Sequence, residues 1–207
     1  MSERGTIRNR FKIKLAEKET RDGRSYTYLG AAALLAARYP DLEFVLPVAP
    51  GMDRELINRC WISKTPVTLV ESSTRYELMR SCRAIMAASG TATLETALLE
   101  VPTAVAYRFS PLTYLLGRML VKVPFISLPN LILDEPVFPE FLQHDANPAA
   151  LAAAVAQWIE ETPSRARVLD RLGALPSLLG NGGAASRAAK IILDTMHSPE
   201  KSPPSAG

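Results

Sequence analysis

The sequence predicts an α/β protein with a Rossmann-like parallel sheet, helices on both faces of that sheet, and a helical C-terminal part. Helix and strand patterns alternate along the first half of the chain. The predicted strands are continuous apolar runs, which is typical of parallel strands that are buried on both faces. From about residue 148 onward the pattern is helical.

The predicted elements follow one another closely. The first helix is rich in Ala and Leu and ends at Pro40, because proline cannot continue a helix. Four helix–strand pairs are predicted, at residues 29–39 and 43–48, 53–60 and 67–70, 73–82 and 84–88, and 91–99 and 103–107. An apolar helix at 112–121, a short apolar run at 125–128 and a loop at Pro129 and Asn130 come next. Helices at 148–161, 163–172 and 184–196 complete the pattern, with a flexible turn at 180–183.

This pattern places one domain at residues 29–196, between two atypical ends. Residues 1–28 are polar and basic, and their pattern fits either a frayed strand or an irregular tail. Residues 197–207 are dominated by proline and serine toward their end, so we expect a disordered tail.

Composition excludes several classes of protein. The 207 residues carry 24 Lys and Arg against 21 Asp and Glu, and the positive excess lies near the start, so a nucleic-acid-binding surface is not indicated. Cys60, Cys82, His144 and His197 have no metal-site spacing, so we expect no metal and no cofactor. The sequence shows no apolar run of about 20 residues and no secretory leader, which favours a cytoplasmic chain.

The segment with the clearest chemistry joins the strand 84–88 to the helix that begins at residue 91. Ligands of open parallel sheets bind beyond the carboxyl ends of the strands, where a helix N-terminus attracts anions. Gly90 permits close approach of a phosphate, and the hydroxyls of Ser89 and Thr91 can donate to it. Glu95 lies one turn further on and can accept from ribose hydroxyls. The alternative is structural, with Ser89 capping the helix and Glu95 complementing its dipole.

A second strand end carries Arg108, which can pair with a phosphate or can simply be a solvated arginine. The helix predicted at 112–121 has apolar positions beside Arg118 and Lys122. Such a helix can touch an anionic membrane surface, although it is more often a core helix with cations at its rim.

A third segment spans residues 127–143. The amide of Asn130 can lock its loop or present a donor and an acceptor to a ligand. Glu140 and Gln143 have the i, i+3 spacing that places two side chains on one helix face, which is equally the pattern of a solvated helix surface.

Taken together, these segments resemble the carboxyl-terminal half of lipid-A-disaccharide synthase, an inverting glycosyltransferase of the two-lobed GT-B architecture. The resemblance is carried by the ordered combination of SGTATLE at 89–95, a YR-P-T pattern at 107–113, SLPNL at 127–131, and PE-LQ at 139–143. It covers residues from about 29 to 196, and the combination is far more specific than any one of its parts.

The resemblance implies transfer of a 2,3-diacylglucosamine unit from its UDP-linked donor to 2,3-diacylglucosamine 1-phosphate, which gives a β-1,6-linked disaccharide and UDP. Ser89, Gly90 and Thr91 are then expected at the diphosphate, and Glu95 at the ribose. Asn130, Glu140 and Gln143 are expected near the donor sugar and nucleotide, with Arg108 as a supporting cation. No metal is implied. The setting expected for such a chain is the cytoplasm, with peripheral contact to the inner membrane of a Gram-negative bacterium.

The sequence departs from the family pattern in two places. A Gly-Ser-Arg loop precedes the first helix in the family, whereas residues 18–25 here read KETRDGRS. The family's amino-terminal lobe, which binds the acceptor and supplies the catalytic acidic residue, has no counterpart in these residues. We therefore expect the chain to be deficient alone. The alternatives are a non-catalytic UDP-binding or oligomerisation module that pairs with its own copies or with a separate acceptor lobe, and another UDP-sugar enzyme of the same fold.

Overall fold

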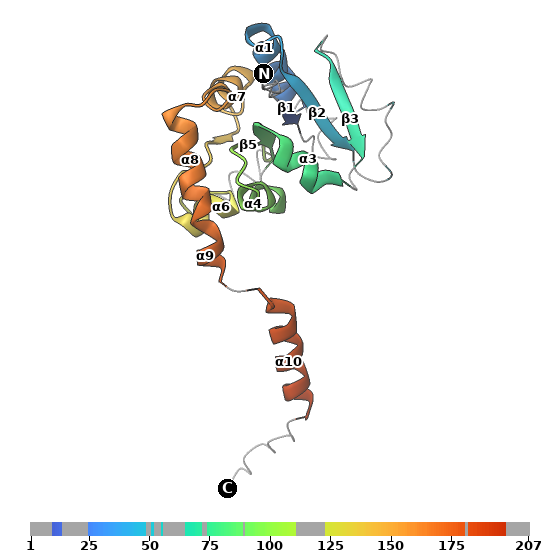
Figure 1. Cartoon of the computed structure of the whole chain (residues 1–207), viewed down its shortest axis with the longest axis vertical. Coiled ribbons are helices and arrows are strands. Elements are labelled where there is room, and N and C mark those ends of the chain that lie inside the picture. Colours follow the sequence, from blue (N-terminus) through green and yellow to red (C-terminus); the bar gives the residue numbers. More distant parts are fainter. Residues whose placement is uncertain are drawn as a thin grey trace, which may run out of the picture.

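The computed structural model describes residues 10–13, 25–48, 51, 55, 65–71, 74–88, 90–110, 123–180 and 182–197 (Figure 1). The strands of this part are β1 Arg10–Ile13, β2 Glu43–Val48, β3 Val67–Glu71, β4 Ala84–Ala87, β5 Thr103–Tyr107 and β6 Glu140–Leu142. Its helices are α1 Ser25–Arg38, α3 Arg75–Ser81, α4 Thr91–Leu98, α6 Leu128–Leu133, α7 Pro148–Ala156, α8 Pro163–Gly173, α9 Leu175–Leu179 and α10 Ala184–His197.

The strands form one parallel sheet in the order β3-β2-β1-β4-β5-β6. The chain therefore moves outward from β1 in one direction and from β4 in the other. In such a sheet the strand order reverses between β1 and β4, and a crevice forms there at the carboxyl ends. The predicted fold class is confirmed, and the reversal of strand order marks the edge of the sheet where the ligands of such folds bind.

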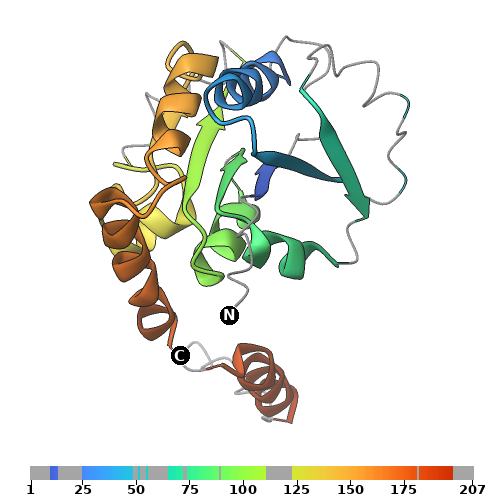
Figure 2. The ribbon, with the colours of Figure 1, turned by 45° about the horizontal axis from the view of Figure 1, so that its top comes forward.

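Helices cover both faces of the sheet (Figure 2). α1 and α7 pack against each other on one face, and α7 also contacts β4 and β5. On the other face, α4 contacts the same two strands, and Ile85 of β4 lies in a cluster with Met79 of α3. β4 is buried along its whole length, which explains why its sequence is continuously apolar.

The close contact of α1 with α7 depends on small residues. Ala31 and Ala32 of α1 are fully buried, and a Cβ placed on Gly30 would lie 2.7 Å from Pro148 Cγ. Tyr28 adds a polar tie to the sheet, because its hydroxyl donates to the carbonyl of Ala106 at 2.7 Å. The Ala-rich composition that predicted this helix is therefore also what lets it approach its neighbour.

Most predicted elements within the described residues are found within one or two residues of their expected ends, but four expectations need correction. α1 begins at Ser25, earlier than predicted, and α7 ends at Ala156, five residues before the predicted end. The segment 10–13, which the sequence left undecided, is a strand between β2 and β4.

The other two corrections concern the third candidate segment. Pro129 and Asn130 are not in a loop, because they lie in the first turn of α6. Glu140 and Gln143 do not share a helix face, because Glu140 begins β6 and Gln143 follows it. Three predicted segments lie wholly or almost wholly outside the described residues, namely the helices 53–60 and 112–121 and the tail from 198 onward.

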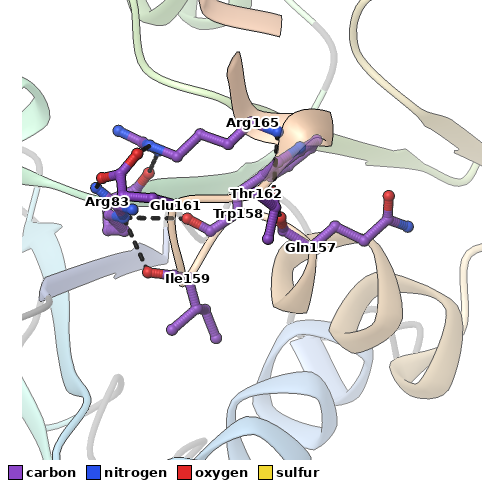
Figure 3. A network of polar contacts seen from close by, with 7 residues as sticks. All are labelled: Arg83, Gln157, Trp158, Ile159, Glu161, Thr162 and Arg165. Atoms are coloured by element: carbon purple, nitrogen blue, oxygen red, sulfur yellow. Dashed lines mark hydrogen bonds and ion pairs between the residues drawn. The ribbon is translucent and has the colours of Figure 1, made fainter. Parts of the chain in front are cut away.

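A polar network ties the end of α7 to the amino end of β4 (Figure 3). Arg83 Nε donates to the carbonyls of Trp158 and Ile159 at 3.1 and 2.9 Å, and its guanidinium pairs with Glu161. Arg165 Nη1 donates to the carbonyl of Arg83 at 2.7 Å. The hydrogen bond from Arg83 lowers the pKa of Glu161, whereas burial lowers the pKa of Arg165. The network therefore lies at the amino ends of the strands, on the side of the sheet away from their carboxyl ends.

α10 stands apart from the helices that cover the sheet (Figure 1). Its apolar side chains are more than half exposed, at 65% for Ile191, 59% for Ile192, 53% for Leu193 and 75% for Met196. In the described part of the chain, none of the helices has both the length and the apolar character needed to cross a membrane.

Candidate functional site

The turn between β4 and α4 lies at the reversal of strand order. Gly90 is the N-cap residue of α4, with φ 151° and ψ −169°, so no side chain caps this helix. That conformation is essentially restricted to glycine. Thr93 strengthens the turn from within, because its Oγ1 donates to the carbonyl of Gly90 at 2.7 Å. Ser89 lies outside the described residues, and Thr91 is exposed as the first residue of the helix.

An uncapped helix N-terminus at this edge is suited to an anion. The first backbone N–H groups of a helix lack partners within the helix, and the helix dipole places partial positive charge there. The predicted alternative, in which Ser89 occupies the N-cap, differs from the structure, where Gly90 holds that position. The N-cap residue therefore brings no side-chain oxygen to the first amides of α4, and Gly90 and Thr91 are exposed at this point.

Glu95, one turn into α4, is held by two residues from the start of α3. Arg75 Nη2 donates to Glu95 Oε1 at 3.1 Å, and the Tyr76 hydroxyl donates to the same oxygen at 3.2 Å. Arg75 also bonds to the Tyr76 hydroxyl, which together with the charge of Glu95 raises the pKa of Arg75. Sequence reasoning missed Arg75 and Tyr76, since they are 20 and 19 residues from Glu95 and only the packing of the fold joins them.

Arg108 and Gln143 meet at the carboxyl ends of β5 and β6. Arg108 donates to the carbonyls of Gln143 and Ala146, through Nε at 3.1 Å and Nη2 at 2.6 Å. The side-chain amide of Gln143 accepts from the backbone N–H of Phe109 at 2.9 Å and donates to its carbonyl at 3.3 Å. These contacts hold the ends of β5 and β6 together. Arg108 and Gln143 therefore both stabilise the structure at the carboxyl edge of the sheet.

Asn130 and Glu140 form a second pair, at the start of α6. Glu140 accepts from the backbone N–H groups of Ile126 and Ser127 at 2.8 and 2.9 Å. The Ser127 hydroxyl adds a bond of 2.6 Å and Asn130 Nδ2 one of 2.8 Å. The Glu140 carboxylate thus satisfies the backbone N–H groups just before α6, although Glu140 itself lies outside that helix. Because α6 packs against α4, this pair is close to the helix that carries Glu95.

A cavity of about 650 Å³ lies elsewhere, between α7, α8 and the strand β6. None of the predicted site residues lines it, and its wall includes Phe141, Trp158 and Val168. Two of its charged residues, Glu135 and Arg171, pair with each other. Within the described residues, no group of three or more His, Cys, Asp and Glu side chains is arranged to hold a metal ion.

Comparison with solved structures defines the class of fold. The chain resembles a co-structure of S. aureus MnaA with UDP, with a TM-score of 0.59 and 15% identity, over 97% of this chain and 48% of that one. It also resembles CalG4, the calicheamicin glycosyltransferase, with a TM-score of 0.58 and 14% identity, over 92% and 44% of the two chains. The protein therefore has the fold of one lobe of the GT-B class.

Within that class, the particular family follows from sequence. Residues 22–178 match the family model described as Lipid-A-disaccharide synthetase, and the chain belongs to that family. The Lipid-A-disaccharide synthase of Geobacter sulfurreducens is 35% identical over 169 residues, which cover 81% of this chain and 44% of the relative. The chain thus spans less than half the length of such curated relatives.

Proposed function

We propose that this chain binds the UDP-activated 2,3-diacylglucosamine donor for lipid A disaccharide synthesis. The acceptor is 2,3-diacylglucosamine 1-phosphate, and the products are the β-1,6-linked disaccharide and UDP. The observation that carries the proposal is the start of α4: an uncapped helix N-terminus behind Gly90, at the reversal of strand order, with the Glu95 carboxylate one turn further on. Membership of the family supports the choice of substrates.

In the proposed reaction, a hydroxyl oxygen of the acceptor attacks the anomeric carbon of the donor sugar. The bond from that carbon to the UDP oxygen breaks, and the electron pair leaves with the diphosphate. In this proposal the amides of α4 and the hydroxyls of Ser89 and Thr91 stabilise this negative charge. No metal or other cofactor is needed for this step. The acceptor's proton passes to a base that we expect on the acceptor-binding lobe.

Glu95 is assigned to the ribose hydroxyls in this proposal. Asn130, Glu140 and Gln143 remain near the donor sugar and nucleotide, where their contacts support a role in shaping the α6 start and the β5 and β6 ends. Arg108 is a supporting cation whose guanidinium is already engaged by two carbonyls, so its positive charge acts at longer range than a direct ion pair.

Calorimetric titration with UDP, GDP and ADP tests the donor site. We expect UDP to bind the full chain and the purine nucleotides to bind at least tenfold more weakly. No heat of binding for UDP would contradict the proposal. Incubation with both lipid substrates then tests whether a separate acceptor-binding lobe is needed for turnover. We expect release of UDP only when such a lobe is supplied. Robust turnover by the chain alone would contradict this part of the proposal.

A second candidate function is association, as a non-catalytic UDP-binding or oligomerisation module. The exposed Ile191, Ile192 and Met196 of α10 favour it, because exposed apolar surface promotes contact with a partner. The partner would be a second copy of this chain or a separate acceptor lobe. Size-exclusion chromatography with light scattering tests it, and a monomer that binds UDP would contradict association as the main role.

Two further expectations come from the sequence, namely an alternative reaction on the same fold and a contact with a membrane surface. Another UDP-sugar reaction on the same fold would be detected by a panel of UDP-sugar donors. Peripheral contact with the cytoplasmic face of an inner membrane was suggested by the helix predicted at 112–121, which lies outside the described residues. Sedimentation with anionic lipid vesicles tests that contact, and recovery of all the protein in the supernatant would contradict it.

A further inference from the structure

The two oxygens of the Glu95 carboxylate have different surroundings. Its Oε1 accepts hydrogen bonds from Arg75 at 3.1 Å and from Tyr76 at 3.2 Å. Among the described residues, no group donates to Oε2. The Glu95 side chain is 27% exposed, so the carboxylate is partly shielded by the protein and partly open to solvent. One oxygen is thus anchored while the other can accept from a ligand.

The anchor comes from a different crossover of the fold than Glu95 itself. Arg75 and Tyr76 begin α3, which links β3 to β4, and Glu95 lies on α4, which links β4 to β5. The Arg75 guanidinium also stands over the Tyr76 ring, 4.5 Å from its centroid, which restricts both side chains. A carboxylate fixed by two donors loses less rotational freedom when a ligand arrives than one that is free to rotate.

We propose that Arg75 and Tyr76 are positioning residues of the donor site, which hold Oε1 of Glu95 so that Oε2 accepts from the ribose hydroxyls of the nucleotide. This inference rests on the proposed function, because it requires a ribose beside Glu95. Neither residue needs to touch the nucleotide. Their contribution reaches the ligand only through the carboxylate.

Six variants of the chain and two nucleotides test the inference by calorimetry. Arg75→Gln and Tyr76→Phe each remove one of the donors that anchor Glu95, and Glu95→Gln removes the charged acceptor. The double variant that combines Arg75→Gln with Glu95→Gln measures the coupling between the two residues. The matched control is Arg80→Gln, an exposed arginine on the same helix. The nucleotides are UDP and its 2′,3′-dideoxy analogue, which lacks the ribose hydroxyls.

We expect Arg75→Gln to weaken UDP binding about two- to fivefold, which is the range for an exposed ion pair. Tyr76→Phe should have a smaller effect, and Arg80→Gln none. Arg75→Gln should add nothing in the Glu95→Gln background and should leave binding of the dideoxy analogue unchanged. Arg75→Lys should restore part of the lost affinity, because it keeps the charge.

Three results would overturn the inference. If UDP binds and Glu95→Gln weakens it while Arg75→Gln does not, the proposed function stands and the positioning role is wrong. If Arg75→Gln weakens UDP and the dideoxy analogue equally, with a lower melting temperature, Arg75 is only a structural residue. If the unaltered chain binds no UDP, the proposed function and the inference fail together.

Discussion

Asn130 and Glu140 bind each other inside the protein, with Asn130 Nδ2 donating to Glu140 Oε1 at 2.8 Å. Asn130 is fully buried, and its amide also donates to the carbonyl of Phe138 at 2.7 Å and accepts from the Phe138 N–H at 2.8 Å. Both of its N–H donors are therefore used within the fold. A change at Asn130 should consequently affect stability before it affects any ligand.

Asn130→Asp should lower the free energy of unfolding by about 2–4 kcal/mol near neutral pH, because it sets a second carboxylate against Glu140 and removes two donors. The charge of Glu140 raises the folded-state pKa of the introduced carboxyl above its unfolded value. The variant's stability is then highest below the unfolded pKa and is lost as the pH rises through the folded one.

Urea denaturation of Asn130→Asp at pH 5 and pH 8 measures this effect, with the larger deficit expected at pH 8. Asn147→Asp is the matched control, because Asn147 is the N-cap of α7 and aspartate caps a helix equally well. A variant of Asn130 with the same deficit at both pH values would show that the charge pair is not the cause.

Glu161 should contribute to acid sensitivity. Since the hydrogen bond from Arg83 lowers the pKa of Glu161, its contribution to stability is present above the unfolded pKa and is lost as the pH falls through the lower folded value. Glu161→Gln should therefore be less stable than the natural sequence at pH 7, and the difference should shrink below about pH 4. Denaturation across this range, with the exposed neighbour Glu160→Gln as control, checks it. A difference that stays constant with pH would contradict the ion pair.

Gly90→Ala should destabilise the protein by about 1–3 kcal/mol, since the backbone conformation at Gly90 is one that alanine rarely adopts. Apart from the adjoining residues of the chain, no atom lies within 4 Å of the position of the added Cβ, so the cost is conformational and not steric. Gly173→Ala, in α8 and with the same free space, should be neutral or stabilising. Thermal melts of the two variants make the comparison. Equal stability of both would show that Gly90 is not conformationally required.

The sequence predicted best those elements whose patterns are local. β4 and α4 were expected within one residue of their bounds, because a fully apolar run followed by a glycine specifies a buried strand, a turn and a helix start. That same local pattern predicted a turn at the carboxyl end of a buried strand, and the structure has the turn between β4 and α4 there. The family resemblance, built on these segments, was confirmed by comparison.

Sequence reasoning was undecided or wrong where contacts between distant parts of the chain determine the structure. The segment 10–13 becomes a strand through pairing with β2 and β4, which lie more than 30 and 70 residues further along the chain. The i, i+3 spacing of Glu140 and Gln143 suggested a helix, but pairing with β5 makes residues 140–142 a strand. The partners of Glu95 were likewise invisible, because an ion pair between residues 75 and 95 requires α3 and α4 to be placed first.

Calorimetric titration of UDP into the unaltered chain and into Glu95→Gln tests the central claim most directly, with Glu77→Gln on α3 as the control. A carboxylate that accepts from ribose hydroxyls is worth about 1–3 kcal/mol, so Glu95→Gln should bind UDP roughly five- to 150-fold more weakly. Its folding should survive, and Glu77→Gln should bind as the unaltered chain does. Unchanged UDP affinity together with a lowered melting temperature would contradict the account and would make Glu95 a residue that only stabilises its helix.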